Sequence, residues 1–380
     1  MKILMVNVPY SGHVNPTLPL TKELIKRGHQ VVYVNAEEFR DKIERTGADF
    51  VAYPNFPVDI GEQKKKCTCF QAAYDTALAL NESFDLLMYE MFFYPGIEIA
   101  RKKGIPCVRQ FSQPAWSEAT LKDASITFRL SAKLIDMQVM GKNKSKDMGL
   151  EHKSLGEAVV YDKPDLNIVY IPEKFQNRRE SFESDYVFVT PKQEVINSNS
   201  NIPFDKIKSP IIYISLGSII SNRGFCKECI RAFGGKEFSV ILNTGKINPD
   251  TLGEIPPNIY AYSYVPQVEV LKHADVFLTH CGMNSVNEAI YAGVPMVAMP
   301  FVNDQLNNAK QIVNLGLGKR VRSFPSRGKE LYQTAQEVYH SKSIREKTTE
   351  MKNELVKEPT WDNIIGKIEE IVRLKLLDKY

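Results

Sequence analysis

Short apolar runs alternate with helical patterns along most of the chain, and no other feature limits the fold as strongly. The run KILMVNV at 2–8 is bounded by Pro9 and Gly12, as is typical of a strand buried inside a parallel sheet. A helical pattern of leucines follows and ends at Gly28. Strands that alternate with helices predict a parallel sheet with helices on both faces. Further strand-like runs in this half lie at 30–35, 49–54, 85–89 and 105–111.

The same alternation restarts in the second half of the chain. The run IIYISLGS at 211–218 repeats the pattern of the opening, an apolar run followed by a glycine turn. A chain of 380 residues is long for one hydrophobic core. We therefore predict an α/β protein of two tandem, doubly wound, Rossmann-like domains with a cleft between them. Further runs lie at 239–245, 258–266, 275–280, 294–300 and 317–321.

The polar, turn-forming stretch at 195–210 is the predicted interdomain linker. It separates an N-terminal domain at 1–200 from a C-terminal domain at 208–360. Residues 361–380 carry apolar side chains at helical spacing and predict an amphipathic helix. We expect this helix to pack back on the N-terminal domain.

Composition narrows the range of partners. The net charge of +4, from 49 basic and 45 acidic residues, is too small to indicate a nucleic-acid-binding surface. No apolar stretch is long enough to span a membrane, and MKILMVNV lacks the features of a signal peptide. The six cysteines are scattered and do not form the paired spacing of a zinc site. We expect a cytoplasmic protein with reduced thiols and no nucleic-acid partner.

The stretch HCGMNSVNEA, which follows the strand-like run VFLT, predicts a ligand site. In open α/β sheets ligands bind at the carboxyl ends of strands, and the N-terminus of a helix attracts anions. Gly282 lets the backbone approach a phosphate, and His280, Asn284 and Ser285 add donors. Glu288 lies one helical turn beyond Ser285, where its carboxylate could accept from the hydroxyls of a ribose.

The alternative is a purely structural helix start. In that case Asn284 or Ser285 would cap the helix and Glu288 would complement its dipole. This alternative accounts for one or two residues but not for His280 together with Gly282 and Glu288.

Two flanking stretches add candidate contacts. In YVPQ, Tyr264 could stack on a base and Gln267 could reach a base edge or a ribose, although Pro266 also suits a plain helix start. In FVNDQ, Asp304 and Gln305 could bond to sugar hydroxyls, although the pair Asn303–Asp304 is also an ordinary helix cap.

The N-terminal turn PYSGHVNP contains a candidate base, His13. A catalytic histidine needs a carboxylate to orient its ring. Glu90 lies at the carboxyl end of its strand and is suited to this, whereas Asp85 lies at the opposite end. The turn lacks the G-x-G-x-x-G pattern of dinucleotide-binding proteins, and the chain contains no P-loop.

Aromatic and methionine side chains are frequent in the N-terminal half and indicate an apolar pocket for a lipophilic or aromatic acceptor. The predicted acceptor-binding residues are Tyr10, Phe92, Phe93 and Trp116.

Three stretches resemble the UDP-sugar-dependent glycosyltransferases of the two-domain GT-B fold. They are SGHVNPTLPL, the run YVPQVEVLKHADVFLTHCGMNSVNEAIYAGVPMVAMPFVNDQLNNA, and GLG. The chain is most similar to the bacterial group that modifies macrolides and other natural products, which is related to plant and animal UDP-glycosyltransferases. The order and spacing of the three stretches fit the pattern of this family over essentially the whole chain.

The resemblance implies that His13 deprotonates the acceptor, with Glu90 at the position of its partner. It places Tyr264 on the uracil, Glu288 on the ribose, and a cluster around Gly282 on the diphosphate. Two positions depart from the family, which often has Trp in place of Tyr264 and usually Asp in place of Glu90. The implied donor-site residues are Gly217, Ser218, Tyr264, Val265, Gln267, His280, Gly282, Asn284, Ser285, Glu288, Asp304 and Gln305.

We therefore expect an inverting glycosyltransferase that moves a hexose, with glucose as the default, from a UDP-sugar to a hydroxyl of a small lipophilic molecule. The chain contains no D-x-D pair to hold Mg²⁺, so we expect no metal and no cofactor beyond the donor. Glu288 favours UDP over dTDP, because it gains most when a 2′-hydroxyl is present. The alternatives are a nucleotide-sugar epimerase or hydrolase on the same fold, or a catalytically impaired UDP-sugar-binding protein. A dinucleotide oxidoreductase is disfavoured by the missing glycine pattern.

Overall fold

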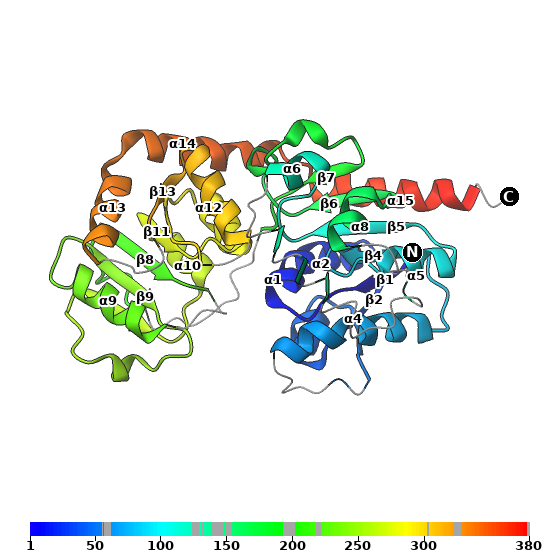
Figure 1. Ribbon diagram of the computed structural model, residues 1–380, viewed down its shortest axis with the longest axis horizontal. Coiled ribbons are helices and arrows are strands. Elements are labelled where there is room, and N and C mark those ends of the chain that lie inside the picture. The colour runs from blue at the N-terminus through cyan, green and yellow to red at the C-terminus, as the bar shows by residue number, and fades with distance from the viewer. Residues whose placement is uncertain are drawn as a thin grey trace. The chain divides into compact units, whose positions relative to one another are not determined.

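The chain forms two compact units in the computed structural model (Figure 1). Unit 1 comprises Met1–Pro191 and Glu358–Tyr380, and unit 2 comprises Lys192–Lys357. The chain thus passes from unit 1 to unit 2 after Pro191, which is before the predicted linker at 195–210. The described residues of that linker, from 202 onward, belong to unit 2. The residues described are 1–54, 56, 62–123, 129–130, 133–134, 136–137, 148, 154–192, 202–217, 222–301, 304–322 and 328–377, without the side chains of 62–67.

Unit 1 contains a sheet of seven strands in the order β3-β2-β1-β4-β5-β6-β7, and all neighbouring strands are parallel. The predicted parallel α/β fold is confirmed here, and β6 and β7 extend the sheet beyond the predicted strands. The strands are β1 Lys2–Val6, β2 Gln30–Asn35, β3 Asp49–Ala52, β4 Leu86–Glu90, β5 Cys107–Phe111, β6 Leu166–Val169 and β7 Tyr186–Phe188.

Helices of unit 1 cover both faces of this sheet. The helix α15 packs against α2, and its side chains Ile364, Ile365 and Ile368 are fully buried in the same core as strands β1 and β4. The helices α4 and α5 pack against each other and against strands β1, β2 and β4. The helices are α1 Ser11–Val14, α2 Leu18–Lys26, α3 Arg40–Glu44, α4 Glu62–Ala79, α5 Gly96–Lys103, α6 Glu118–Asp123, α8 Leu155–Tyr161 and α15 Trp361–Leu377, with 3-10 turns η1 Asn15–Thr17, η2 Glu37–Phe39, η3 Glu173–Phe175 and η4 Arg179–Ser181.

Unit 2 contains a six-stranded sheet in the order β10-β9-β8-β11-β12-β13, again with every pair parallel. Its strands are β8 Ile211–Ser215, β9 Ser239–Asn243, β10 Ile259–Tyr262, β11 Val276–Thr279, β12 Met296–Ala298 and β13 Gly318–Arg320. Its helices are α9 Arg223–Phe233, α10 Gln267–Leu271, α11 Met283–Ala292, α12 Asp304–Asn314, α13 Gly328–His340 and α14 Lys342–Glu354, with 3-10 turns η5 Pro249–Leu252 and η6 Leu355–Lys357.

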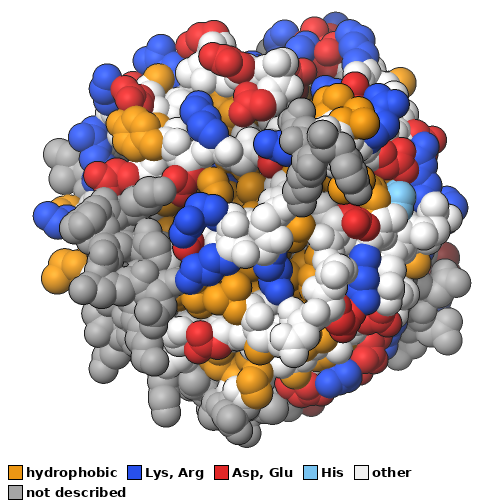
Figure 2. Space-filling view, turned by 90° about the vertical axis from the view of Figure 1, so that its right-hand side faces the viewer, with side chains coloured by type: hydrophobic (Ala, Val, Ile, Leu, Met, Phe, Trp, Pro, Cys, Tyr) orange, Lys and Arg blue, Asp and Glu red, His pale blue; other side chains and the backbone are white. Residues whose placement is uncertain are grey.

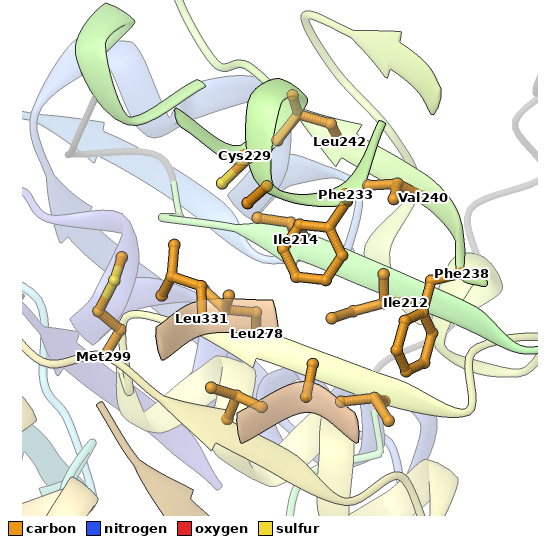
Figure 3. Packing of buried hydrophobic residues seen from close by; sticks show 14 of the residues in the cluster. Ile212, Ile214, Cys229, Phe233, Phe238, Val240, Leu242, Leu278, Met299 and Leu331 are labelled. Carbon is orange, nitrogen blue, oxygen red and sulfur yellow. The ribbon is translucent and has the colours of Figure 1, made fainter. Parts of the chain in front are cut away.

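The core of unit 2 lies between its sheet and the pair α9 and α13. Phe233 from α9 and Leu331 from α13 pack with strand residues such as Ile214 and Leu278 (Figure 3). Both helices are amphipathic, so the apolar side of each faces the sheet. This packing fixes the strand ends from which the loops discussed below project.

The surface carries both signs of charge. On the face in Figure 2, Lys and Arg side chains lie among acidic and hydrophobic ones. Within the described part of the chain, no helix combines the length and hydropathy needed to cross a membrane. The five cysteines whose side chains are described form no disulfide, and the side chain of Cys67 is not described.

Candidate active site

His13 is held at the carboxyl end of strand β1 by backbone contacts. Its N–H donates to the carbonyl of Tyr10 over 2.9 Å, and its own carbonyl accepts from Asn7 Nδ2 over 3.0 Å. Four residues separate the end of the strand from the short helix α1, which presents the imidazole at this edge of the sheet.

The structure brings His13 and Glu90 together. His13 Nδ1 lies 2.9 Å from Glu90 Oε1, and the Glu90 side chain is fully buried while that of His13 is partly exposed. A carboxylate accepts, so Nδ1 carries the proton in this pair and the lone pair is on Nε2. This is the tautomer that a general base requires.

Two further contacts fix the Glu90 carboxylate. Its Oε2 accepts from the backbone N–H of Phe92 over 2.8 Å, and its Oε1 accepts from Ser112 Oγ over 2.8 Å. Ser112 Oγ also lies 2.8 Å from His13 Nδ1. Oε1 thus contacts both His13 and Ser112, and Oε2 contacts the backbone of Phe92. These contacts hold the Glu90 side chain, one methylene longer than Asp, in one orientation.

Ser112 is absent from the residues predicted from the sequence. Glu90 is paired with Gln110 in the parallel register of β4 and β5, so a residue just beyond Gln110 lies at the same edge of the sheet as His13. The available signal was a hydroxyl directly after the strand-like run IPCVRQF.

Aromatic rings surround the His13 imidazole. The ring of Phe92 packs edge to face against it at 4.8 Å between centroids, and Trp116 packs against Phe92 at 6.1 Å. Tyr10 lies 6.1 Å from His13 on an edge-to-face contact. The structure thus groups three of the four predicted acceptor-binding residues around the candidate base.

The prediction for Phe93 is wrong. Its side chain has no exposed surface and packs against Phe70 of α4, so it belongs to the core of unit 1. Phe92 and Phe93 are adjacent, and the turn after β4 directs one ring toward His13 and the other into the interior.

In unit 2, the N-terminus of α11 is capped by Gly282 without a side-chain hydrogen bond. The alternative in which Asn284 or Ser285 caps this helix is therefore wrong. The N-terminus of α11 follows the carboxyl end of β11 closely, a position whose helix dipole favours a bound anion.

The His280 imidazole lies tightly between two glycines. A Cβ built on Gly217 would lie 2.6 Å from His280 Cε1, and one built on Gly282 would lie 2.5 Å from His280 Nε2. Gly217 also has a φ of +74°, in the left-handed region. Both positions therefore need glycine to keep the ring where it is.

Burial sets the charge of His280. It lowers the pKa of the imidazole to about 4, so the ring is neutral near pH 7. Its Nδ1 is buried and makes no hydrogen bond to any described residue. The neutral ring of the free protein can offer a phosphate a hydrogen bond from one of its nitrogens.

The side-chain amide of Gln267 makes hydrogen bonds to other side chains of unit 2. Its Nε2 donates to Glu288 Oε2 over 2.7 Å and to Ser285 Oγ over 3.0 Å, and its Oε1 accepts from Tyr213 OH over 3.1 Å. Both amide hydrogens are used, so Gln267 supports Glu288 in this structure. Tyr213, on β8, was not among the predicted site residues. Burial raises the pKa of Glu288 to about 7.

The remaining predicted donor residues lie on neighbouring loops and helix starts of unit 2. The side chain of Tyr264 is 75% exposed, as a stacking platform requires, and Val265 is buried. Gln305 Oε1 accepts from the N–H of Phe301 over 2.9 Å, and Asp304 is the first residue of α12. Asn284 is partly buried in the first turn of α11, and Ser218 lies outside the described residues.

No group of three or more His, Cys, Asp or Glu side chains that could hold a metal ion occurs among the residues with described positions. Metal independence stays a prediction.

Known proteins resemble this chain in sequence and in fold. The family model described as UDP-glucoronosyl and UDP-glucosyl transferase matches residues 206–356. The NDP-glycosyltransferase YjiC of Bacillus subtilis (strain 168) is 32% identical and is aligned over 83% of each chain. The uncharacterized UDP-glucosyltransferase YojK of the same organism is 30% identical over 92% of each chain.

The solved structure of CalG4, the calicheamicin glycosyltransferase, covers 98% of both chains with a TM-score of 0.78 and 26% identity. The two sheets are thus those of a GT-B glycosyltransferase, as the sequence predicted. The chain belongs to the UDP-glucoronosyl and UDP-glucosyl transferase family.

Proposed function

We propose that this glycosyltransferase moves a hexose, with glucose as the first donor to test, from a UDP-sugar to a hydroxyl of a lipophilic or aromatic natural product, with inversion and without a metal. The observation that carries the proposal is the His13–Glu90 pair, with 2.9 Å between Nδ1 and Oε1. It is the arrangement of a general base that deprotonates an acceptor hydroxyl.

In the proposed mechanism, His13 Nε2 takes the acceptor proton while the oxygen attacks the anomeric carbon from the side opposite UDP. The negative charge that develops on UDP is stabilised by the N–H groups at Gly282 and by hydrogen bonds from His280 and Ser285. Glu288 accepts from the ribose hydroxyls, and the exposed Tyr264 ring stacks on the base. Asp304 and Gln305 bond to the donor sugar.

Similarity to known proteins and the rings near His13 support the proposed donor and the proposed acceptor. The relative YojK is described as a UDP-glucosyltransferase, which supports UDP-glucose as donor. Likeness to a calicheamicin glycosyltransferase and the aromatic rings of Phe92 and Trp116 beside His13 support an apolar natural-product acceptor.

The test is a mass-spectrometric assay of the full chain with UDP-glucose, a pool of phenolic and macrocyclic acceptors, and a chelator. A product heavier by one hexose, with UDP released, is the expected result. Release of UDP without any glycosylated acceptor would instead favour the hydrolase or epimerase alternative. The impaired-binder alternative rests on Glu90 in place of Asp, and the 2.9 Å contact of Glu90 with His13 supports an active pair over that alternative.

Ser112→Ala is expected to lower kcat by about 10-fold, because removing one hydrogen bond to a charged carboxylate costs about 1.5–3 kcal/mol and part of that loss falls on the transition state. The affinity for UDP should not change. Steady-state kinetics and calorimetric titration with UDP measure the two quantities. Ser117→Ala is the matched control, since Ser117 Oγ bonds to Ser181 and not to the His13–Glu90 pair; equal kcat values for the two variants would contradict the role of Ser112.

The affinity for UDP is expected to rise with pH through about 7, the raised pKa of the Glu288 carboxyl in the free protein. Ribose hydroxyls donate best to the ionised carboxylate, so binding lowers this pKa and releases a proton. Calorimetry between pH 6 and 8 on the wild type and Glu288→Gln measures the effect. Protonation of the UDP phosphate affects binding to both proteins equally, so the dissociation constant of Glu288→Gln divided by that of the wild type reports on Glu288 alone. This ratio should be largest above pH 7, and a ratio that does not vary with pH would contradict the assignment.

A further inference from the structure

The turn between β11 and α11 has an unusual backbone conformation at Cys281. Its φ is +67°, and Arg178 is the one other non-glycine residue with positive φ in the part of the chain that the structure describes. The left-handed region is unfavourable for a residue with a Cβ, and Cys is not among the residues that tolerate it best. Such a conformation persists only where surrounding contacts hold it.

Cys281 lies between the two residues whose placement matters most in the proposed diphosphate site. The preceding residue is His280, whose ring is in close contact with Gly217 and Gly282. The following residue is Gly282, which caps α11. A change of the Cys281 backbone would therefore move both the imidazole and the first N–H groups of the helix.

Asn308, on α12, holds this turn from the side. Its Nδ2 donates to the Cys281 carbonyl over 2.9 Å. On the other side of the same residue, the Cys281 N–H donates to Thr279 Oγ1 over 3.1 Å. The bond from Asn308 is thus the contact that comes from a separate helix.

The burial of Asn308 indicates that its amide has a task other than packing. Its side chain is 1% exposed, and its Oδ1 is buried without a hydrogen-bond partner among the described residues. A buried polar atom without a partner destabilises the folded state, and an apolar side chain would avoid this penalty. The hydrogen bond from Asn308 Nδ2 to the Cys281 carbonyl is the favourable contact that offsets this penalty.

We propose that Asn308 is a positioning residue of the donor site, which holds Cys281 in the left-handed conformation so that His280 and the N-terminus of α11 are aligned for a diphosphate. The inference rests on the proposed function, because the diphosphate is that of the UDP-sugar.

The experiment compares two neighbouring asparagines of α12 by calorimetric titration of the full chain with UDP. Asn308→Ala is expected to weaken UDP binding by about 10- to 100-fold, since it removes the hydrogen bond that holds the turn. Asn307 is exposed, and Asn307→Ala is expected to bind UDP as the wild type does. Equal affinities of the two variants would overturn the inference.

A second substitution separates positioning from general damage to the fold. Glycine adopts the left-handed conformation without a steric penalty, so Cys281→Gly should recover about 10-fold of the affinity lost in Asn308→Ala, as measured in a double-mutant cycle. A merely structural role of Asn308 gives no such rescue, because removing a second buried side chain would add to the damage. Failure to recover any affinity in the folded double variant would also overturn the inference.

Where Asn308→Ala does not fold, the pair Cys281→Ser and Cys281→Thr tests the step through which Asn308 is proposed to act, the left-handed conformation of Cys281. Thr is β-branched and strongly disfavoured in the left-handed region, whereas Ser is not branched. The Thr variant should bind UDP about 10-fold more weakly than the Ser variant, in line with the penalty for a branched residue at positive φ, and equal affinities would overturn the proposal. A wild-type protein that binds no UDP at all would overturn the proposed donor and the inference with it, whereas unaltered binding by Asn308→Ala overturns the inference alone.

Discussion

His13→Ala is expected to lower kcat for sugar transfer by about 10²- to 10⁴-fold, the usual contribution of a general base, while the affinity for UDP stays unchanged. The acceptor hydroxyl then has to lose its proton to water, which is a poorer base and is not held in place. The UDP affinity is retained because the proposed nucleotide contacts all come from unit 2, whereas His13 belongs to unit 1.

The measurement is kcat with UDP-glucose and the acceptor found by the mass-spectrometric assay, together with a UDP titration. A second histidine–carboxylate pair in unit 1 provides the matched control. His29 Nε2 lies 3.0 Å from Glu369 Oε1, but His29 directly precedes β2 and so lies at the amino ends of the strands, the opposite edge of the sheet from His13. His29→Ala should leave kcat unchanged, and a kcat for His13→Ala within a few-fold of that control would rule out His13 as the base.

Gly282→Ala is expected to weaken UDP binding by about 10- to 100-fold, because overpacking by one methyl group typically costs about 1–3 kcal/mol. The backbone of Gly282, with φ −62° and ψ 138°, is one that alanine adopts readily. The penalty therefore comes from the new Cβ, which would lie 2.5 Å from His280 Nε2. The imidazole has to leave its place between the two glycines or the helix start has to shift.

Calorimetric titration with UDP and thermal unfolding check this expectation. Gly366→Ala on α15 is the control, because a Cβ at that position meets no atom within 4 Å. It should bind UDP normally and be slightly stabilised, since alanine is favoured over glycine in a helix. Full UDP affinity of a folded Gly282→Ala variant would show that His280 does not need its present position to hold the nucleotide.

The sequence predicted the elements whose signal is local. Apolar runs followed by glycine turns located strands such as β1 and β8, and helical spacing located α15. The strands β6 and β7 were missed, because the alternation of strands and helices breaks there: only the 3-10 turns η3 and η4 separate the two strands.

The candidate site shows the same limit at the level of side chains. The pairing of His13 with Glu90 could be predicted, because both lie at the carboxyl ends of strands that the topology makes neighbours. The contacts of Ser112 and Tyr213 could not, because they depend on distances of about 3 Å between residues far apart in the sequence. The assignment of Phe93 failed for a related reason, since the direction of a side chain after a strand depends on the turn and not on the residue type.

The return of α15 to unit 1 determines the order in which the chain can fold during its synthesis. Unit 2 is one continuous stretch, Lys192–Lys357, and all of it leaves the ribosome before α15 does. Unit 1 appears first but lacks the buried side chains of Ile364, Ile365 and Ile368 until translation has passed unit 2. The nascent chain therefore exposes the α2 side of its first core for as long as unit 2 is being synthesised, and exposed apolar surface of this kind makes a partly folded chain prone to aggregation.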